Sequence, residues 1–264
     1  MPEFACGGPI SVNITLAAGS CQVLAEDRDN AVVTVTPHKN NNKSKEAAEK
    51  TSVDFRDNKL IIRTPDMTSW LMGSNAAIDI VVSVPSHSSV TAKSASASIT
   101  FQGDIEIASA TTASGSITVE KAAEASVNTA SGDAHVIECS GTVRGNTVSG
   151  DLQLDHVGGD INAKSVSGDV RIGFAGGSLN GNSVSGDINV SAMRAGHGKL
   201  KSVSGSVSIG IASGTGVWMD LNTVSGTTSS DLAVGDMPTS TAANLELHIN
   251  TISGNIDLFR AQPV

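Results

Sequence analysis

The feature that most constrains this chain is a five-residue segment that returns at a fixed spacing. Thr147 to Asp151 reads Thr-Val-Ser-Gly-Asp, and nearly the same segment recurs at Ser165 to Asp169 and at Ser183 to Asp187, each 18 residues after the last. A fixed period of this size is typical of a repeat architecture, in which each short unit stacks on its neighbours and covers their apolar edges. The glycines of the Ser-Gly pairs mark the copies: Gly115, Gly132, Gly150, Gly168, Gly186, Gly205, Gly226 and Gly254.

The number and spacing of these glycines predict how many rungs the repeat forms. Successive gaps are 17, 18, 18, 18, 19, 21 and 28 residues, and a degenerate earlier copy places Ala97 another 18 residues upstream of Gly115. The pattern predicts about nine rungs that are regular in the middle and loosen after Gly205. The loosening predicts a loop insertion near residues 227–244. This insertion is the best candidate for a partner site, because binding residues concentrate on loops held by a rigid scaffold.

Each rung carries the period of a β-strand. Aliphatic residues stand two and four positions after the glycine, as Val170 and Ile172 do after Gly168, with a polar residue between them. Such alternation is typical of a strand with one buried and one solvated face. A second strand precedes the turn, and there a large inward residue is paired with a small one, which keeps the volume of each core layer constant. The pairs are Val143 with Gly145, Ile161 with Ala163, and Leu179 with Gly181.

The sequence therefore predicts an all-β chain. Residues 93–264 are expected to form a β-solenoid of the right-handed parallel β-helix type with about nine 18-residue rungs, and residues 1–92, which lack the repeat, a β-rich N-terminal cap. A cap has a physical purpose, since the first rung of a solenoid exposes unpaired strand edges. The left-handed hexapeptide helix is excluded, because it needs an aliphatic residue at every sixth position.

The Ser-Gly pair is interpreted as a corner. Glycine readily takes the positive φ of a tight turn, and the serines of successive rungs are expected to stack as a ladder of hydroxyl groups. A nucleophilic role is not supported, since no base accompanies these serines. Trp218 and Met219 are expected to pack over the last rungs as an apolar lid.

Four aspartates follow consecutive Ser-Gly pairs and should stack in a ladder: Asp133, Asp151, Asp169 and Asp187. A cation-binding edge is one interpretation, but calcium prefers six to eight oxygens around one ion, and a single carboxylate per rung does not supply them. Turn chemistry explains the ladder better. The six histidines are spread singly and no phosphate loop occurs, so no catalytic, cofactor-binding or metal-binding residue is predicted.

Composition narrows the function classes. The net charge of −9 argues against a nucleic-acid partner and an anionic membrane surface. Aromatic residues are scarce, which argues against extended stacking sites but leaves a small one at Trp70 or Trp218 open. No apolar run is long enough for membrane insertion, and no signal peptide is visible, so a cytoplasmic location is expected, with surface exposure by another route left open. Cys6, Cys21 and Cys139 form no even disulfide framework.

Several segments together resemble the bacterial putative-adhesin β-strand repeat family. They are the run Val81 to Pro85, the tandem Thr/Ser-Val-Ser-Gly-Asp copies, the segment Trp218 to Gly226 and the closing Thr251 to Ile256. The resemblance implies a β-solenoid and supplies no catalytic residues. We expect a non-catalytic, adhesin-like module that binds an unidentified protein partner or serves as a scaffold. A self-assembling structural scaffold is the alternative, and a carbohydrate-active β-helix enzyme is the further one.

Overall fold

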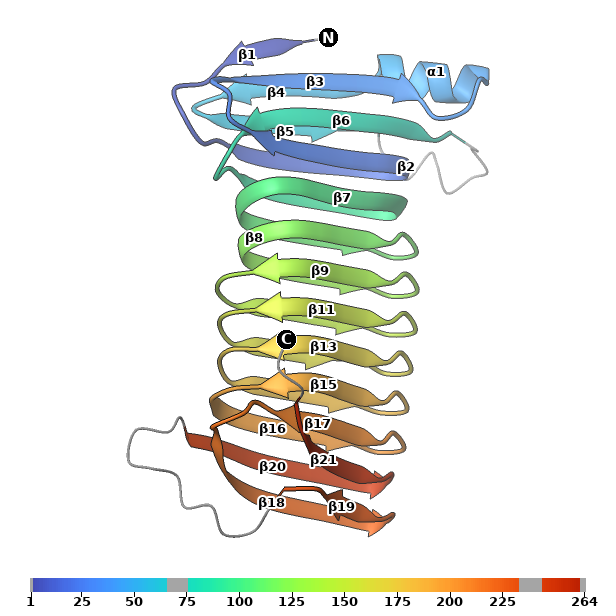
Figure 1. The fold of residues 1–264 in the computed structure, drawn as a ribbon. Coiled ribbons are helices and arrows are strands. Elements are labelled where there is room, and N and C mark those ends of the chain that lie inside the picture. Colours follow the sequence, from blue (N-terminus) through green and yellow to red (C-terminus); the bar gives the residue numbers. More distant parts are fainter. Residues whose placement is uncertain (1, 66–75, 233–243, 262–264) are drawn as a thin grey trace. The chain divides into compact units, whose positions relative to one another are not determined.

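The computed structural model describes residues 2–65, 76–232 and 244–261 (Figure 1). The chain forms two compact units, Met1–Gly132 (unit 1) and Asp133–Val264 (unit 2). Both consist almost wholly of β-strands, which confirms the predicted β-solenoid class. The boundary that the repeat predicts between residues 92 and 93 falls inside unit 1, within strand β7 (Ser89–Thr112), and stays a prediction.

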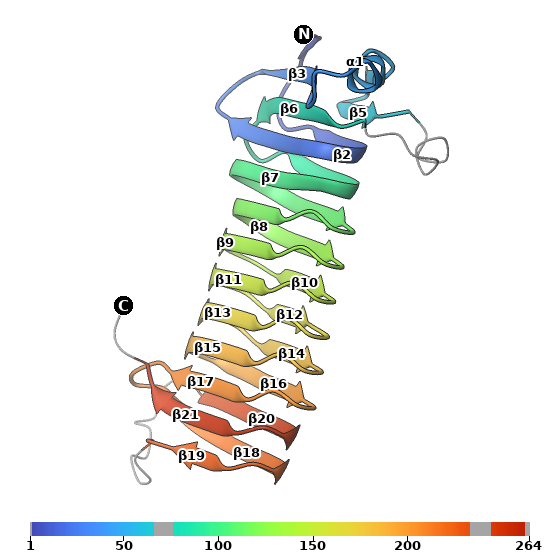
Figure 2. The ribbon, with the colours of Figure 1, turned by 90° about the vertical axis from the view of Figure 1, so that its right-hand side faces the viewer.

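Unit 1 is organised around one long strand, β2, which pairs in parallel with β7 along one edge (Figure 2). Its other edge is shared by two further parallel strands, β5 against its first part and β6 against its second. Antiparallel strands complete the unit, since β4 pairs with β5, and β3 with β6 and β1. The elements are β1 (Glu3–Ala5), β2 (Ser11–Glu26), β3 (Asn30–Pro37), α1 (Asn42–Glu49), β4 (Ser52–Arg56), β5 (Lys59–Arg63), β6 (Ile78–Pro85), β7 and β8 (Ile117–Thr129).

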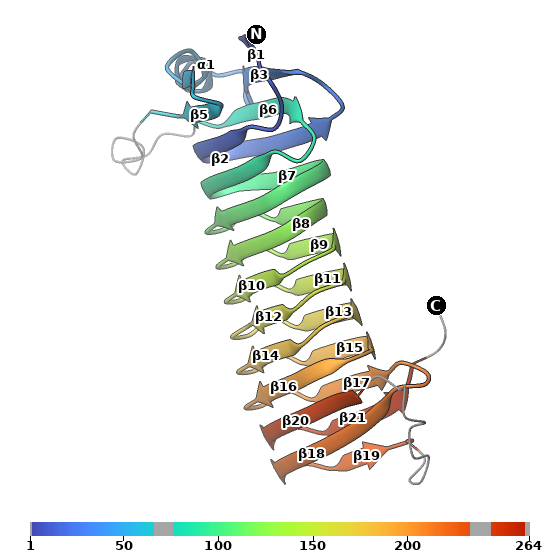
Figure 3. The same ribbon diagram turned by 90° about the vertical axis from the view of Figure 1, so that its left-hand side faces the viewer.

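Unit 2 is a stack of two-stranded rungs. The first stack holds the strands before each Ser-Gly turn: β10 (Val143–Thr147), β12 (Ile161–Lys164), β14 (Leu179–Ser183), β16 (Gly196–Ser202), β20 (Asn244–Ser253) and β18 (Gly216–Ser225). The second stack holds β9 (Ala134–Cys139) and the strands after each turn: β11 (Leu152–Val157), β13 (Val170–Ala175), β15 (Ile188–Met193), β17 (Val207–Ile211), β21 (Ile256–Arg260) and β19 (Thr228–Ser230). All of the pairings within each stack are parallel (Figure 3).

The core of unit 2 shows the predicted exchange of large and small residues between layers. Val143, Ile161 and Leu179 lie in one column, and Gly145, Ala163 and Gly181 lie in the next. Further along both columns the order reverses, because Gly198 follows Leu179 and Leu200 follows Gly181. A Cβ atom added at Gly181 would meet the side chain of Leu200, so the neighbouring large residue already fills the space. Constant layer volume therefore explains the pattern.

The glycines of the Ser-Gly corners are required for a different reason from the predicted one. None of them has a positive φ. Instead, a Cβ atom at Gly168 would fall on the carbonyl oxygen of Gly150, and one at Gly186 on that of Gly168. The corners of successive rungs pass too close for any side chain. The predicted turn conformation was wrong, and close stacking of backbone explains the glycine.

The hydroxyl ladder also lies at another position than predicted. The serines of the Ser-Gly pairs are exposed, whereas the residue three positions before the glycine is buried in every rung but the outermost, where Thr223 is half-buried. The Oγ1 of Thr147 accepts the N–H of Gly150 at 3.1 Å and donates to its carbonyl oxygen at 2.7 Å. Ser183 accepts the N–H of Gly186 in the same way, at 2.9 Å. This buried hydroxyl closes each corner from the inside.

The last two rungs are not stacked in chain order. β18 precedes β20 in the sequence, yet β20 pairs with β16 along one edge and with β18 along the other (Figure 1). In the second stack, β21 likewise lies between β17 and β19. The final described segment is therefore inserted as the penultimate rung, and the segment before it forms the outermost rung.

Candidate functional site

The four predicted aspartates form one column along the corners of unit 2. The Oδ1 atom of each accepts the backbone N–H of the residue at the same position in the next rung, at 2.9 Å between Asp151 N and Asp133 and at 3.0 Å between Asp169 N and Asp151. The same bond joins Asp187 to Asp169 at 3.0 Å, and Ser206 donates to Asp187 at 2.8 Å. Each carboxylate thus ties neighbouring turns together, rather than closing a turn of its own.

The other carboxylate oxygens of this column meet a cation of the protein itself. Arg171 on β13 donates to Oδ2 of Asp151 at 2.6 Å and to Oδ2 of Asp169 at 2.7 Å. This guanidinium, together with the N–H of Asp169, lowers the pKa of Asp151 below its ordinary value. Throughout the described residues, no three His, Cys, Asp or Glu side chains form a group that could hold a metal ion.

An exposed column of aliphatic side chains runs beside the aspartates in unit 2. Its members stand two positions before the glycine of each corner, and their backbones are hydrogen-bonded from rung to rung, as Ser167 N–H is to the carbonyl of Val148 at 2.8 Å. The exposed fractions of these side chains range from 41% to 83%. In stacking order the members are Val148, Val166, Val184, Val203, Ile252 and Val224, which we call the aliphatic column.

Sequence reasoning missed this column although its signal was visible. In the regular copies the hydroxyl residue is buried, so the residue directly after it in the strand must point outward, as Val166 does after Ser165. A solvated corner position is ordinarily polar. Valine in the same outward position of successive copies is therefore the signal that could have revealed the column.

Trp218 lies on the outer face of the outermost rung and is not the predicted lid. Its side chain is 57% exposed. Its neighbours Val217 and Met219 are less exposed, as expected when residues of a strand alternate between two faces. The indole contacts the imidazole of His248 on β20 edge to face, with the ring centroids 5.1 Å apart. Tryptophan is enriched at interfaces because its ring is apolar and its N–H is polar.

His248 is held between two carboxylates. Its Nε2 lies 2.9 Å from Oε1 of Glu246, and its Nδ1 lies 3.5 Å from Oδ2 of Asp220. His197 on β16 reaches the other oxygen of Glu246 at 2.9 Å. The hydrogen bond to Glu246 is the largest cause that raises the pKa of His248, and Asp220 raises it further. His248 in turn lowers the pKa of Glu246. We call these four residues and Trp218 the Trp218 cluster.

The β-sheet register explains how the Trp218 cluster assembles. His197, Glu246 and Trp218 occupy one row across three neighbouring strands, and His248 and Asp220 lie in the next row. The cluster shares its strands with the aliphatic column, since β18 carries Trp218 near its start and Val224 near its end. The two features therefore belong to the same outer surface of unit 2.

Parts of two predicted sites lie outside the described residues. Of the loop insertion expected near 227–244, residues 233–243 lie outside them, as does Trp70. Residues 227–232 belong to the outermost rung, where Thr227 N–H donates to Oδ1 of Asn255 at 3.0 Å and β19 pairs with β21. Within the described ranges the helix is α1, and no helix is long and apolar enough to cross a membrane.

Comparison with known proteins identifies the repeat. Residues 12–258 match the model of the family described as Toastrack DUF4097, which confirms the resemblance predicted from the repeats and the Trp218 segment. A comparison with curated proteins finds no match.

A comparison with solved structures finds matches at low sequence identity. A putative adhesin from Bacteroides fragilis NCTC 9343 has a TM-score of 0.50 and 10% identity, with 97% of this chain and 95% of that chain covered. A putative lipid binding protein from Parabacteroides distasonis ATCC 8503 has a TM-score of 0.47 and 11% identity, with 97% and 95% covered. A putative cell adhesion protein from Clostridium sporogenes ATCC 15579 has a TM-score of 0.29 and 11% identity, with 98% of each chain covered. The first of these supports the fold of the chain and nothing beyond it.

Proposed function

The chain belongs to the Toastrack DUF4097 family, and we propose that it is a non-catalytic binding protein whose second unit presents the aliphatic column to a protein partner. The observation that carries this proposal is the exposure of that column, from 41% at Val203 to 83% at Val224. Contiguous exposed apolar surface is uncommon on monomeric soluble proteins and marks interaction sites. At a rung spacing of about 4.8 Å, the six side chains extend over roughly 24 Å.

The scaffold favours binding because the column is already ordered. The valines are β-branched and restricted at χ1, so little side-chain entropy is lost when a partner covers them. The backbone beneath them is fixed by inter-rung hydrogen bonds, such as Ser185 N–H to the carbonyl of Val166 at 2.8 Å. Docking on the column therefore requires little further ordering of the valines.

Polar residues on both sides of the column form the rim that a protein interface needs. Lys164 and Lys201 stand two positions before their column valines, and Asp151, Asp169 and Asp187 stand three positions after theirs. An apolar ridge between a basic and an acidic edge fits a protein surface with an apolar groove and charges of both signs. Trp218, on the same surface, supplies an aromatic anchor of the kind enriched in binding hot spots.

The contacts of the carboxylates support a non-catalytic role. A carbohydrate-active enzyme needs two carboxyl groups that flank the scissile bond of a substrate. In unit 2, Asp151 and Asp169 are engaged by backbone N–H groups and by Arg171. Asp220 and Glu246 lie on the outer face, but His248 occupies the space between them.

The proposal is tested with a partner captured from native lysate, identified, purified and titrated against the chain. Replacing Val148, Val166 and Val184 together by Thr keeps the β-branched shape and removes apolar surface. Burial of a half-exposed valine contributes about 1 kcal/mol, so the triple variant should bind roughly 100-fold more weakly. The matched control replaces the adjacent exposed Ser149, Ser167 and Ser185 by Ala and should bind like the wild type. Equal affinity of the valine variant and the wild type would contradict the proposal.

Self-association is the second candidate, and the outermost rung favours it. Among the described residues β18 pairs with β20 alone, and its inward Val217, Met219 and Leu221 are partly exposed. The equivalent Leu245 and Leu247 one rung further in are 1% and 0% exposed. An open strand edge of this kind recruits other strands. Sedimentation velocity should then show assembly that grows with protein concentration and is abolished by Leu221→Lys, whereas a monomer at every concentration would exclude this candidate.

A further inference from the structure

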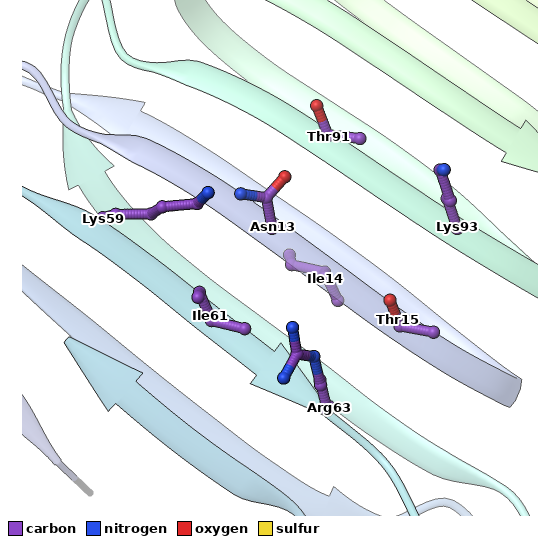
Figure 4. Close-up of a pocket in the computed structure, with 8 residues that line it drawn as sticks. All are labelled: Asn13, Ile14, Thr15, Lys59, Ile61, Arg63, Thr91 and Lys93. Atoms are coloured by element: carbon purple, nitrogen blue, oxygen red, sulfur yellow. The ribbon is translucent and has the colours of Figure 1, made fainter. Parts of the chain in front are cut away.

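The outer face of unit 1 carries a cleft of about 250 Å³ that has no counterpart among the features above. Three parallel strands line it, with β2 in the centre, β5 on one edge and β7 on the other (Figure 4). The lining residues are Asn13, Ile14, Thr15, Lys59, Ile61, Arg63, Thr91 and Lys93.

The strand register explains why cations gather there. Val12 and Ile14 on β2 are buried, so Asn13 and Thr15 between and after them face outward. Thr15 pairs with Arg63 on one side and with Lys93 on the other, so two cations flank one hydroxyl group in a single row.

The next rows add polar groups and a third cation. Asn13 lies between Ile61 and Thr91 in the adjacent row. Lys59 begins β5 directly after a hairpin turn in which Asp57 and Asn58 both adopt a positive φ, of 50° and 56°. That turn fixes the start of the strand and with it the place of Lys59. Figure 4 shows the three cationic side chains arranged around Asn13 and Thr15.

Among the described residues, no carboxylate neutralises the cations of the cleft. In the part of the chain that the structure describes, Lys59, Arg63 and Lys93 form no ion pair, whereas Lys121 binds Asp104 at 2.8 Å elsewhere in unit 1. The carboxylate closest in register is Asp54 on β4, which lies opposite Ile61 and forms no ion pair with these residues. Three convergent positive charges on a chain of net charge −9 are therefore available to a ligand.

We propose that this cleft binds the phosphoryl group of a phosphate ester. A phosphate dianion has several acceptor oxygens and can be approached by one guanidinium and two ammonium groups at once, which a single carboxylate cannot match. Arg63 supplies the planar fork, Lys59 and Lys93 supply mobile point charges, and the hydroxyl groups of Thr15 and Thr91 and the amide of Asn13 supply further donors. The half-buried Ile61 contributes an apolar surface for the remainder of the ester.

The test uses the full-length chain and three probes at one fixed ionic strength, because screening weakens contacts between exposed charges. The probes are inorganic phosphate, glycerol 3-phosphate, and vesicles of phosphatidic acid in phosphatidylcholine beside vesicles of phosphatidylcholine alone. Binding of the soluble probes is followed by calorimetry and by chemical shifts of backbone amides, and binding of vesicles by co-sedimentation.

The test variant is Arg63→Gln with Lys93→Gln. The matched control, Lys39→Gln with Lys45→Gln, changes the net charge equally at exposed positions outside the cleft. Circular dichroism establishes that both fold. The wild type and the control should bind at least one phosphate probe with shifts at Thr15 and Thr91, and the test variant should bind at least tenfold more weakly. The single variant Arg63→Lys, which keeps the charge, should retain part of the binding that the test variant loses.

The outcomes distinguish a soluble phosphate ester from a lipid headgroup as the ligand, and they distinguish both from failure of the proposal. Binding of glycerol 3-phosphate that depends on Arg63 and Lys93 supports a soluble ester, and binding restricted to phosphatidic acid vesicles supports a lipid headgroup. The proposal is overturned if the wild type binds none of the probes. It is equally overturned if both double variants lose binding to the same extent, because net charge rather than the cleft would then explain it.

Discussion

Replacing Gly168 by alanine tests the reason for the corner glycines. Its φ is not positive, so the backbone conformation itself would accept alanine. The new Cβ, however, would fall on the carbonyl oxygen of Gly150, 2.5 Å from its carbonyl carbon and 3.1 Å from the backbone nitrogen of Asp151. All of these atoms belong to backbone, which cannot rotate away as a side chain does.

The expected cost follows from the bonds that hold the two rungs together at this point. Ser167 N–H donates to the carbonyl of Val148 at 2.8 Å, and Asp169 N–H donates to Asp151 at 3.0 Å. Moving the corners apart lengthens both. With about 1 kcal/mol for each weakened hydrogen bond and about 1 kcal/mol for residual overpacking, the free energy of unfolding should fall by about 3 kcal/mol.

The assay is guanidinium chloride unfolding followed by far-UV circular dichroism. Gly7→Ala is the matched control, because a Cβ there meets nothing within 4 Å, and it should stay within about 0.5 kcal/mol of the wild type. Gly145→Ala should give an intermediate loss, since the nearest atoms to its Cβ belong to the side chain of Leu152, which can shift where backbone cannot. A loss of less than about 0.5 kcal/mol for Gly168→Ala would refute close backbone stacking as the reason for the glycine.

Three further predictions concern unit 2. In an NMR titration the pKa of His248 should lie above 6.5 and should fall in Glu246→Gln. Because the pKa is raised in the folded state, the stabilisation by His248 is complete below the unfolded pKa and disappears as the pH rises through the folded pKa. An unshifted pKa would contradict the bridged geometry. The pKa of Asp151 is lowered, so its contribution is present above the unfolded pKa of about 3.8 and is lost as pH falls through the folded value; acid-unfolding curves of Asp151→Asn should lack this component, and superimposable curves would argue against it. Deleting residues 244–264 should open β18 to limited proteolysis, because β18 pairs with β20; continued protection of β18 would indicate rungs stacked in chain order.

The period of the core could be predicted from the sequence because every rung meets the same physical demand. The core layer with Ile161 and Ala163 needs about the same volume as the neighbouring layer with Val143 and Gly145. The same demand repeats in each rung until the period breaks. The position of the corners was equally visible, although the need for Gly168 came from its neighbour and not from its own φ. A contact between two rungs cannot be read from the sequence of either rung alone.

The exchange of the last two rungs could not be predicted, and the Trp218 cluster depends on it. β18 and β20 both place aliphatic residues at alternate positions, as Met219 and Leu247 show, so either strand suits either layer. Only the exchange brings Glu246 between His197 and Trp218. A surface built from three strands that are not stacked in chain order has no spacing that a sequence motif could reveal.

The most direct test of the proposed binding role is methyl NMR of the valine-labelled chain with and without its purified partner. The outward valines of the column should shift or broaden on binding, while buried valines such as Val170 and Val207, which are 0% exposed, should keep their shifts. The methyl groups of Val148, Val166 and Val184 are therefore expected to report the interface together. Saturating binding that leaves these three unchanged and moves signals elsewhere in the chain would contradict the account.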